Sequence, residues 1–220
     1  EGAWVWSGNR WWYRYNDGSY PVGGIYEIDG VDYAFDSAGW MVTGWYLEKE
    51  GWYYFAGNGA KHTGWIQLNG TWYYLMNGNE DPQYPGRMAA DCEKKIGNAV
   101  YRFASSGAMV KGWVLQGNDW YYYVPSGARA EGGWQFINGV WYYFLDETED
   151  PQHPGRMVAD CEKEIKNKRY KFASSGAMVT GWLQLGDVRY YLAEDGKMLT
   201  GLQTIDGVEY EFDTSGACIS

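Results

Sequence analysis

The residue types from which catalytic and metal sites are usually built are scarce in this chain. Its 220 residues contain 2 His and 3 Cys. Neither type recurs at the short spacings of a zinc site, and no nucleophile motif accompanies the histidines. The cysteines show no pairing pattern that would indicate a disulfide framework. We therefore expect no catalytic residues, no cofactor and no metal site.

Positive charge and long apolar runs are also lacking. Lys and Arg number 18 against 28 Asp and Glu, which gives a net charge of -10 and argues against a nucleic-acid partner. The mean hydropathy is -0.52, and no apolar run is long enough for a membrane span. No charged-then-apolar start resembles a signal peptide, so we expect neither feature within the chain.

Aromatic side chains, in contrast, are abundant. The chain has 14 Trp, 21 Tyr and 7 Phe, which together make 19% of its residues. Disordered chains are poor in aromatic residues, so a folded structure is expected. The aromatic content nevertheless exceeds what a compact core of this size needs, and the excess requires an explanation.

Internal repeats account for the organisation of the chain. It divides into about ten units of about twenty residues, which begin near residues 3, 24, 44, 64, 92, 112, 133, 161, 181 and 201. We number the first residue of each unit as position 0. Turn signals such as Asn69-Gly70 lie near position 6 and are typical of β-hairpins. Large side chains at positions 9 and 11 predict an inward stripe that a single hairpin cannot bury. The sequence therefore predicts an all-β fold, a solenoid of stacked β-hairpins that forms one elongated repeat domain over residues 1–220.

Two of the units carry an insertion. Both insertions contain Glu-Asp-Pro-Gln and predict loops near 77–85 and 146–154. We expect the adjacent acids to be solvated, because a catalytic pair needs a defined separation across a substrate. Contact between the loops and a ligand is the alternative, and a bound Ca²⁺ is a weaker one. The segments 87–96 and 156–165 are rich in helix formers, so a short helix is predicted there.

Positions 1, 8 and 10 change together from unit to unit. Where position 8 is Trp, position 10 is Tyr and position 1 is Trp, whereas the units starting at residues 24, 92 and 161 have no aromatic residue at any of the three. Positions 8 and 10 should face away from the inward stripe. With roughly three hairpins per superhelical turn, one side of the solenoid would lack aromatic residues and the others would carry them. Exposed apolar patches usually mark binding surfaces, although rings that only join neighbouring hairpins are the alternative.

Converging Trp and Tyr rings suit two kinds of ligand. A quaternary ammonium gains about 0.5–2 kcal/mol per contact from cation–π attraction, and a sugar ring can stack on a flat aromatic face. The acidic net charge favours the cation. One small cage binds weakly, with a dissociation constant on the order of millimolar, so repetition predicts a polymer that displays many copies of the ligand.

Two segments carry a resemblance to a known family. The run Gly64-Trp65-Ile-Gln-Leu-Asn-Gly70-Thr-Trp72-Tyr73-Tyr74, and Gly181-Trp182 followed by Gly196-Lys197-Met198-Leu199-Thr200-Gly201, resemble the choline-binding cell-wall repeats of bacterial surface proteins and lysins. The resemblance covers essentially the whole chain. It implies a left-handed solenoid in which Trp and Tyr hold choline between consecutive hairpins. By position, the ligand-binding residues it implies are Trp4, Trp11, Trp45, Trp52, Tyr54, Trp65, Trp72, Tyr74, Trp113, Trp120, Tyr122, Trp134, Trp141, Tyr143, Trp182 and Tyr191.

The resemblance implies a non-catalytic module that binds choline on wall teichoic or lipoteichoic acids. Such a module would be extracellular and associated with the cell wall, and it is compatible with an effector domain outside this chain. The units starting at residues 24 and 201 are closer to the repeats of glucan-binding proteins and clostridial toxins. A lectin-like domain that binds glucan or a host glycan is therefore the alternative. A structural spacer of a surface adhesin is the second alternative.

Overall fold

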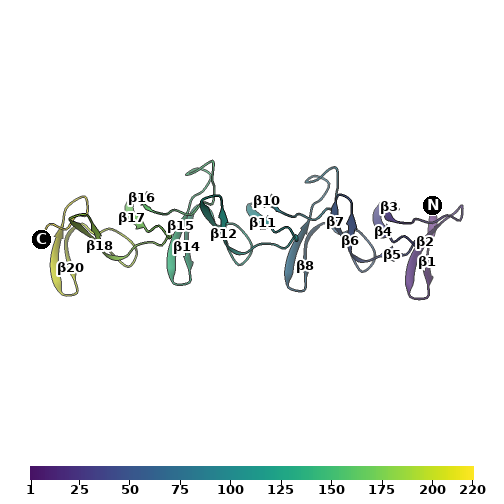
Figure 1. Ribbon diagram of the computed structural model, residues 1–220, viewed down its shortest axis with the longest axis horizontal. Helices are drawn as coiled ribbons and strands as arrows, with labels where there is room; N and C mark the ends of the chain where they lie inside the picture. Colours follow the sequence, from purple (N-terminus) through teal and green to yellow (C-terminus); the bar gives the residue numbers. More distant parts are fainter. The chain divides into compact units, whose positions relative to one another are not determined.

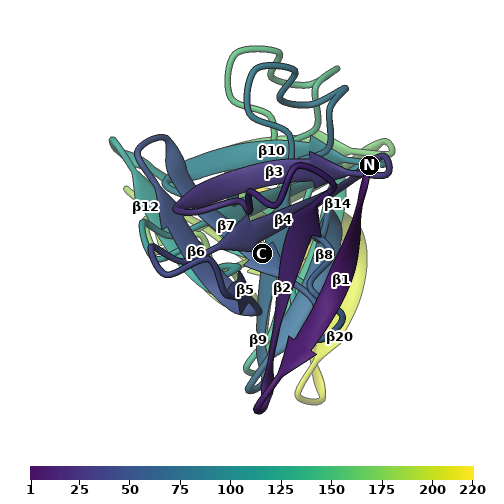
Figure 2. The same cartoon turned by 90° about the vertical axis from the view of Figure 1, so that its right-hand side faces the viewer.

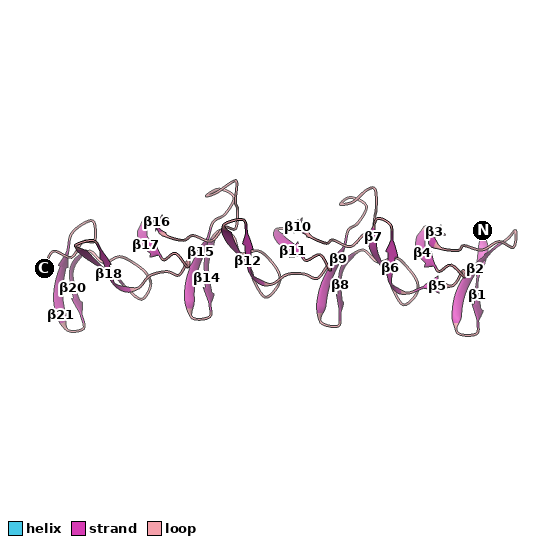
Figure 3. Cartoon of the chain, in the orientation of Figure 1, coloured by secondary structure: helices cyan, strands magenta, loops and turns pink.

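The computed structural model describes residues 1–220, which divide into two compact units, Glu1–Val110 and Lys111–Ser220. Each unit consists of antiparallel β-hairpins joined by loops, and no segment is helical (Figures 1 and 3). The strands of the first unit are β1 (Gly2–Ser7), β2 (Arg10–Tyr15), β3 (Gly24–Ile28), β4 (Val31–Phe35), β5 (Met41–Val42), β6 (Gly44–Glu48), β7 (Gly51–Phe55), β8 (Gly64–Leu68), β9 (Thr71–Leu75), β10 (Cys92–Ile96) and β11 (Ala99–Phe103). Those of the second unit are β12 (Gly112–Gln116), β13 (Asp119–Tyr123), β14 (Gly133–Ile137), β15 (Val140–Phe144), β16 (Cys161–Ile165), β17 (Lys168–Phe172), β18 (Gly181–Leu185), β19 (Val188–Leu192), β20 (Gly201–Ile205) and β21 (Val208–Phe212). The predicted all-β class is confirmed.

The turn residues set the register of each hairpin. In the pair β8–β9, Asn69 and Gly70 both have positive φ, 49° and 81°, as a two-residue type I′ turn requires. Position 0 then pairs with position 11, as Gly64 does with Leu75. In nine hairpins the first strand begins at position 0 of a repeat unit, and β1 begins one residue before Ala3.

Position 11 forms the centre of each stack. The side chains there are almost completely buried in the second and later hairpins, and they are Phe35, Phe55, Leu75, Phe103, Tyr123, Phe144, Phe172, Leu192 and Phe212. Within each unit, these side chains pack against the opposite face of the preceding hairpin. Tyr74 of β9, for example, lies in one cluster with Phe103 of β11. Position 10 faces away from the position-11 side chains, as expected, but stacking covers that face near the base of the hairpin, so Tyr13, Tyr74 and Tyr143 are buried and not exposed.

Consecutive hairpins are also linked through the backbone. The N–H of Met88, after β9, donates to the carbonyl of Trp52 in β7 at 2.8 Å, and the N–H of Met178 donates to the carbonyl of Trp141 at 2.9 Å. In the first unit, β1–β2, β3–β4 and β6–β7 point in three different directions, and β8–β9 points the same way as β1–β2 (Figure 2). This arrangement within the unit agrees with the three-hairpin period expected from the sequence.

The two predicted helices are wrong. Cys92–Ile96 forms strand β10, and Cys161–Ile165 forms strand β16. Each pairs with the strand after its turn, and a cross-strand ion pair joins Glu93 to Arg102 at 3.6 Å. Helix propensity differs by only a few tenths of a kcal/mol between such residues, so pairing and stacking decide the structure.

The prediction of solvated acids in the first inserted loop is also wrong. Asp81 is 9% exposed and accepts a hydrogen bond from Arg87 Nε at 2.8 Å. Glu80 accepts hydrogen bonds from the Tyr74 hydroxyl at 2.9 Å and from the Asn77 N–H at 3.0 Å. The hydroxyl of a tyrosine buried by stacking needs an acceptor, and the loop folds back to supply one.

The second inserted loop repeats these contacts. Glu149 accepts a hydrogen bond from the Tyr143 hydroxyl at 3.3 Å and pairs with Lys163 at 3.1 Å. Asp150 accepts a hydrogen bond from Arg156 Nε at 2.9 Å. The acids of both loops therefore stabilise the loop conformation.

Two further features bear on the sequence predictions. The structure contains no helix with the length and apolar character needed to cross a membrane. Cys92, Cys161 and Cys218 are all free thiols.

Candidate functional site

Two tryptophans of one hairpin lie almost at right angles to each other. Positions 1 and 8 are diagonal neighbours on one face of the antiparallel pair, so their side chains meet. The ring centroids of Trp45 and Trp52 are 6.3 Å apart with an interplanar angle of 85°, and those of Trp134 and Trp141 are 6.3 Å apart at 87°. The same arrangement recurs in Trp65–Trp72 and Trp113–Trp120. The two indoles of a hairpin therefore form two adjoining walls.

The next hairpin supplies a third wall. Tyr73, at position 9 of that hairpin, meets Trp45 edge to face with centroids 5.0 Å apart, and Tyr170 meets Trp134 in the same way at 4.9 Å. The backbone hydrogen bond from Met88 to the carbonyl of Trp52 brings the methionine to the same place. Each corner is thus closed by a tyrosine and a methionine of the following hairpin.

These walls enclose cavities within the units. One, of about 280 Å³, is lined by Trp45, Trp52, Tyr73, Met88 and Ser106. A second, of about 370 Å³, is lined by Trp4, Trp11, Tyr33, Met41, Gly57 and Asn58. A third, of about 230 Å³, is lined by Trp134, Trp141, Tyr170, Met178 and Asp195. The volumes suit a small head group surrounded by aromatic faces.

The three cavities differ mainly in the residue at position 14 of the repeat unit that lies two units after the Trp pair. It is Asn58, Ser106 or Asp195. A hydrogen bond from Lys197 lowers the pKa of Asp195, so its carboxylate is ionised at neutral pH. The third cavity therefore carries an anion at its rim, although the adjacent ammonium of Lys197 partly neutralises it.

The chain matches two families of repeats over segments that correspond to its hairpin units. Residues 93–132 and 130–180 match a choline-binding repeat. Residues 43–61, 63–81 and 180–198 match a putative cell wall binding repeat. No curated protein matches the chain at a significant level.

Solved structures extend the similarity to the whole chain. CbpJ from Streptococcus pneumoniae TIGR4 is 28% identical with a TM-score of 0.64, and the match covers 99% of this chain and 94% of that one. Choline binding protein F from Streptococcus pneumoniae, in the presence of a peptidoglycan analogue, is 30% identical with a TM-score of 0.59 over 99% and 92% of the two chains. The chain belongs to the choline-binding repeat family. A structure of CbpF in complex with ipratropium, obtained by soaking, matches at 29% identity with a TM-score of 0.59 over 99% and 93%.

Six of the residues that the resemblance implied as ligands line the cavities of these choline-binding repeats. They are Trp4, Trp11, Trp45, Trp52, Trp134 and Trp141. Trp65 with Trp72, and Trp113 with Trp120, form the same perpendicular pairs and meet Tyr101 and Tyr142 of the next hairpins at 4.9 Å. Tyr54, Tyr74, Tyr122 and Tyr143 lie beside their own hairpin's position-1 Trp, with centroids 5.0–5.2 Å apart.

The residues that complete the cavities are absent from the sequence-based set. They are Tyr33, Tyr73 and Tyr170 at position 9, and Met41, Met88 and Met178 at position 17. Position 9 looked like part of the core stripe because it is Tyr in every unit after the first. The signal available in the sequence was the recurrence of Tyr and Met one unit after each Trp pair.

Tyr74 and Tyr143 have a second role in these repeats. Burial, together with the hydrogen bond to Glu80, raises the pKa of Tyr74 to about 12. Burial and the charge of Glu149 likewise raise the pKa of Tyr143 to about 12. Both hydroxyls therefore stay protonated and hold the inserted loops.

Hairpin β18–β19 departs from the pattern. Trp182 occupies position 1 and meets Tyr191 at 5.1 Å, but position 8 is Arg189. The guanidinium carbon of Arg189 lies 5.0 Å from the centroid of the Trp182 ring. A cation of the chain itself thus occupies the place that an indole takes in the other repeats.

Proposed function

We propose that the chain is a non-catalytic cell-wall-binding module that holds choline head groups of wall teichoic or lipoteichoic acids in the cavities between its hairpins. The observation that carries this proposal is the repeated cavity with two perpendicular Trp rings and a Tyr from the next hairpin. Ring faces attract a quaternary ammonium by about 0.5–2 kcal/mol per contact. The methionine side chain offers an apolar contact for the methyl groups.

The hairpins without the aromatic set argue against a purely structural role for the Trp pairs. Hairpin β3–β4 has Ile25 and Ala34 where other hairpins have Trp and Tyr. Ala34 nevertheless packs fully buried against Tyr53 and Phe55 of the next hairpin. Stacking therefore does not need the tryptophans, and this favours a ligand over a spacer.

The lining favours a cation over a sugar. A sugar needs oriented hydrogen bonds at its hydroxyls, whereas a quaternary ammonium needs apolar faces. The cavity of Trp45 and Trp52 offers the Ser106 hydroxyl as its one polar side chain besides the rings. Arg189 on Trp182 shows that such an indole accepts a cation in this fold. Ipratropium, which CbpF holds in its complex, is itself a quaternary ammonium compound.

Repetition favours a polymer as the partner. A single cage of this kind binds with a dissociation constant on the order of millimolar. Several cages on one chain raise the avidity for a polymer that displays many head groups. The match to a putative cell wall binding repeat supports a location at the cell surface, where such a polymer lies.

Calorimetric titration of the chain with choline chloride tests the proposal. We expect saturable binding at millimolar concentrations and quenching or a shift of Trp fluorescence. Tetramethylammonium should bind with similar affinity, because it keeps the methylated cation. Ethanolamine should bind at least about tenfold more weakly, since its primary ammonium is strongly hydrated and loses more on entering the cavity.

Three outcomes would contradict the proposal. No response up to tens of millimolar choline, together with retention on a glucan resin, would support the lectin-like alternative. No response to either ligand would support the structural spacer. Equal affinity for choline and ethanolamine would show that the methylated cation is not what the cavity recognises.

A further inference from the structure

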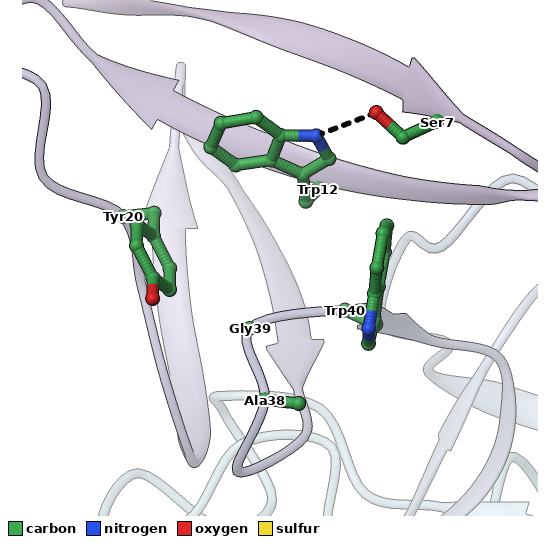
Figure 4. A pocket seen from close by; sticks show the side chains of 6 residues that line it. All are labelled: Ser7, Trp12, Tyr20, Ala38, Gly39 and Trp40. Atoms are coloured by element: carbon green, nitrogen blue, oxygen red, sulfur yellow. Dashed lines mark hydrogen bonds between the residues drawn. The ribbon is translucent and has the colours of Figure 1, made fainter.

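A fourth cavity lies beside the first hairpin and is not formed by a position-1 and position-8 Trp pair. It measures about 280 Å³ and is lined by Ser7, Trp12, Tyr20, Ala38, Gly39 and Trp40. Figure 4 shows the rings of Tyr20 and Trp40 on opposite sides of the space, with Trp12 between them on a third side. Trp12 and Tyr20 meet edge to face with centroids 5.8 Å apart. The cavity is therefore a cage of three aromatic rings.

The repeat register relates this cage to the three other cavities. Trp12 is at position 9 and Tyr20 at position 17 of the first repeat unit, where later units place the Tyr and Met that line their cavities. Ala38 is at position 14 of the next unit, as Asn58, Ser106 and Asp195 are in theirs. The cage thus shares positions 9, 17 and 14 with the other cavities but lacks their Trp pair.

Trp40 takes the place of the missing Trp pair. It is at position 16, where half of the units have Ala, as in Ala60 and Ala108. Its backbone N–H donates to Asp36 Oδ1 at 2.9 Å, and Asp36 also pairs with Arg10 at 2.7 Å. The guanidinium carbon of Arg10 lies 5.1 Å from the centroid of the Trp40 ring, and Arg10 is not among the lining residues. The turn that carries Trp40 is therefore anchored by Asp36, and Arg10 packs on the indole from outside the cavity.

Close packing also fixes Tyr20. Gly39 has a φ of 82°, and a Cβ atom there would approach the Tyr20 ring to 2.7 Å. The absence of a side chain lets the Tyr20 ring pack directly on the turn. Both opposing rings are thus placed before any ligand arrives, which lowers the entropic cost of binding.

The polar groups of the cage favour one class of ligand. The Ser7 hydroxyl accepts a hydrogen bond from the Trp12 indole N–H at 3.3 Å. The lining contains no carboxylate, amide or guanidinium to orient the hydroxyls of a sugar. We propose that the cage of Trp12, Tyr20 and Trp40 is an additional binding site for a quaternary ammonium head group. Its ligand class rests on the proposed function, but its location does not.

Two-dimensional NMR of the Trp indole N–H groups during a choline titration tests the site directly. In the unaltered chain, the signals of Trp12 and Trp40 should shift with choline and saturate. Trp40→Leu keeps an apolar side chain but removes the ring, so the Trp12 shift should disappear and calorimetry should count one site fewer per chain. Trp40→Phe should retain the site.

Trp52→Leu is the matched control, because it removes a ring from another cavity and should leave the Trp12 shift unchanged. If the signals of Trp12 and Trp40 do not move while Trp52 responds, the inference is wrong and the proposed function stands. If no indole responds to choline, the proposed function fails as well. An unchanged site count in Trp40→Leu would also overturn the inference.

Discussion

Replacing Trp52 by Ala separates a binding role of the position-8 indole from a structural one. Trp52 is 41% exposed and forms one wall of the cavity that also contains Trp45 and Tyr73. Its backbone carbonyl, which the substitution leaves in place, accepts the inter-hairpin hydrogen bond from Met88. The substitution therefore removes a wall of the cavity and keeps the link between the hairpins.

The expected effects differ for binding and for folding. Loss of one cation–π contact costs about 0.5–2 kcal/mol, which corresponds to roughly 2- to 30-fold weaker choline binding at this cavity. A fully buried Trp→Ala change costs about 3–5 kcal/mol of unfolding free energy. Because Trp52 is 41% exposed, we expect a smaller loss of about 2 kcal/mol.

The assay combines calorimetry with urea denaturation, and Leu47→Ala is its control. Leu47 lies directly across the hairpin from Trp52, is 58% exposed and is not among the residues that line the cavity. It should leave choline affinity unchanged and alter the unfolding free energy by less than about 1 kcal/mol. Trp52→Ala and Leu47→Ala alter the same face of the same hairpin, so they differ only in whether a cavity wall is lost.

Two results would refute this reasoning. Unchanged choline binding in Trp52→Ala, with a loss of stability above about 3 kcal/mol, would mean that the indole serves as a joint between hairpins. An equal loss of affinity in Trp52→Ala and Leu47→Ala would mean that the change acts through the hairpin as a whole.

Three further changes have expected outcomes. Arg189→Trp restores the perpendicular pair in hairpin β18–β19 and should add one choline site, counted by calorimetry. Because burial and Glu80 raise the pKa of Tyr74 from 10.0 to about 12, the folded state holds this proton more tightly than the unfolded chain does. The free energy of unfolding should therefore be fully retained below pH 10 and fall between pH 10 and pH 12, and Glu80→Gln should reduce that fall in denaturation curves. Asp81→Asn weakens a mostly buried ion pair and should lower the unfolding free energy by about 1–3 kcal/mol, whereas Glu147→Gln, at an exposed position of the second loop, should have little effect.

The hairpins themselves were predictable because their signals are local. A turn such as Asn69-Gly70 sets the register within a few residues, and the alternation after it places position 11 in the core. The Trp pair was predictable for the same reason, since positions 1 and 8 belong to one hairpin. These features depend on neighbours that lie close in sequence.

The failed predictions involve strand pairing, stacking or loop contacts that composition alone does not specify. Cys92–Ile96 favours a helix by composition, yet it pairs with Ala99–Phe103 and stacks as a strand. Glu80 looked solvated until the structure brought the hydroxyl of Tyr74 to it. In both cases a contact made in three dimensions outweighs a weak local preference.

The binding cavity depends both on features within one hairpin and on contacts between hairpins. The sequence alone determined the repeat, the hairpins and the pairs of tryptophans, because each is specified within about twenty residues. Only the tertiary structure decided that Tyr73 and Met88 complete the cavity of Trp52, and that Trp40 closes a separate cage with Tyr20. The physical reason is stacking. It brings position 9 of one hairpin against position 1 of the preceding one. A pattern within a single unit does not specify which residues of two different units come into contact.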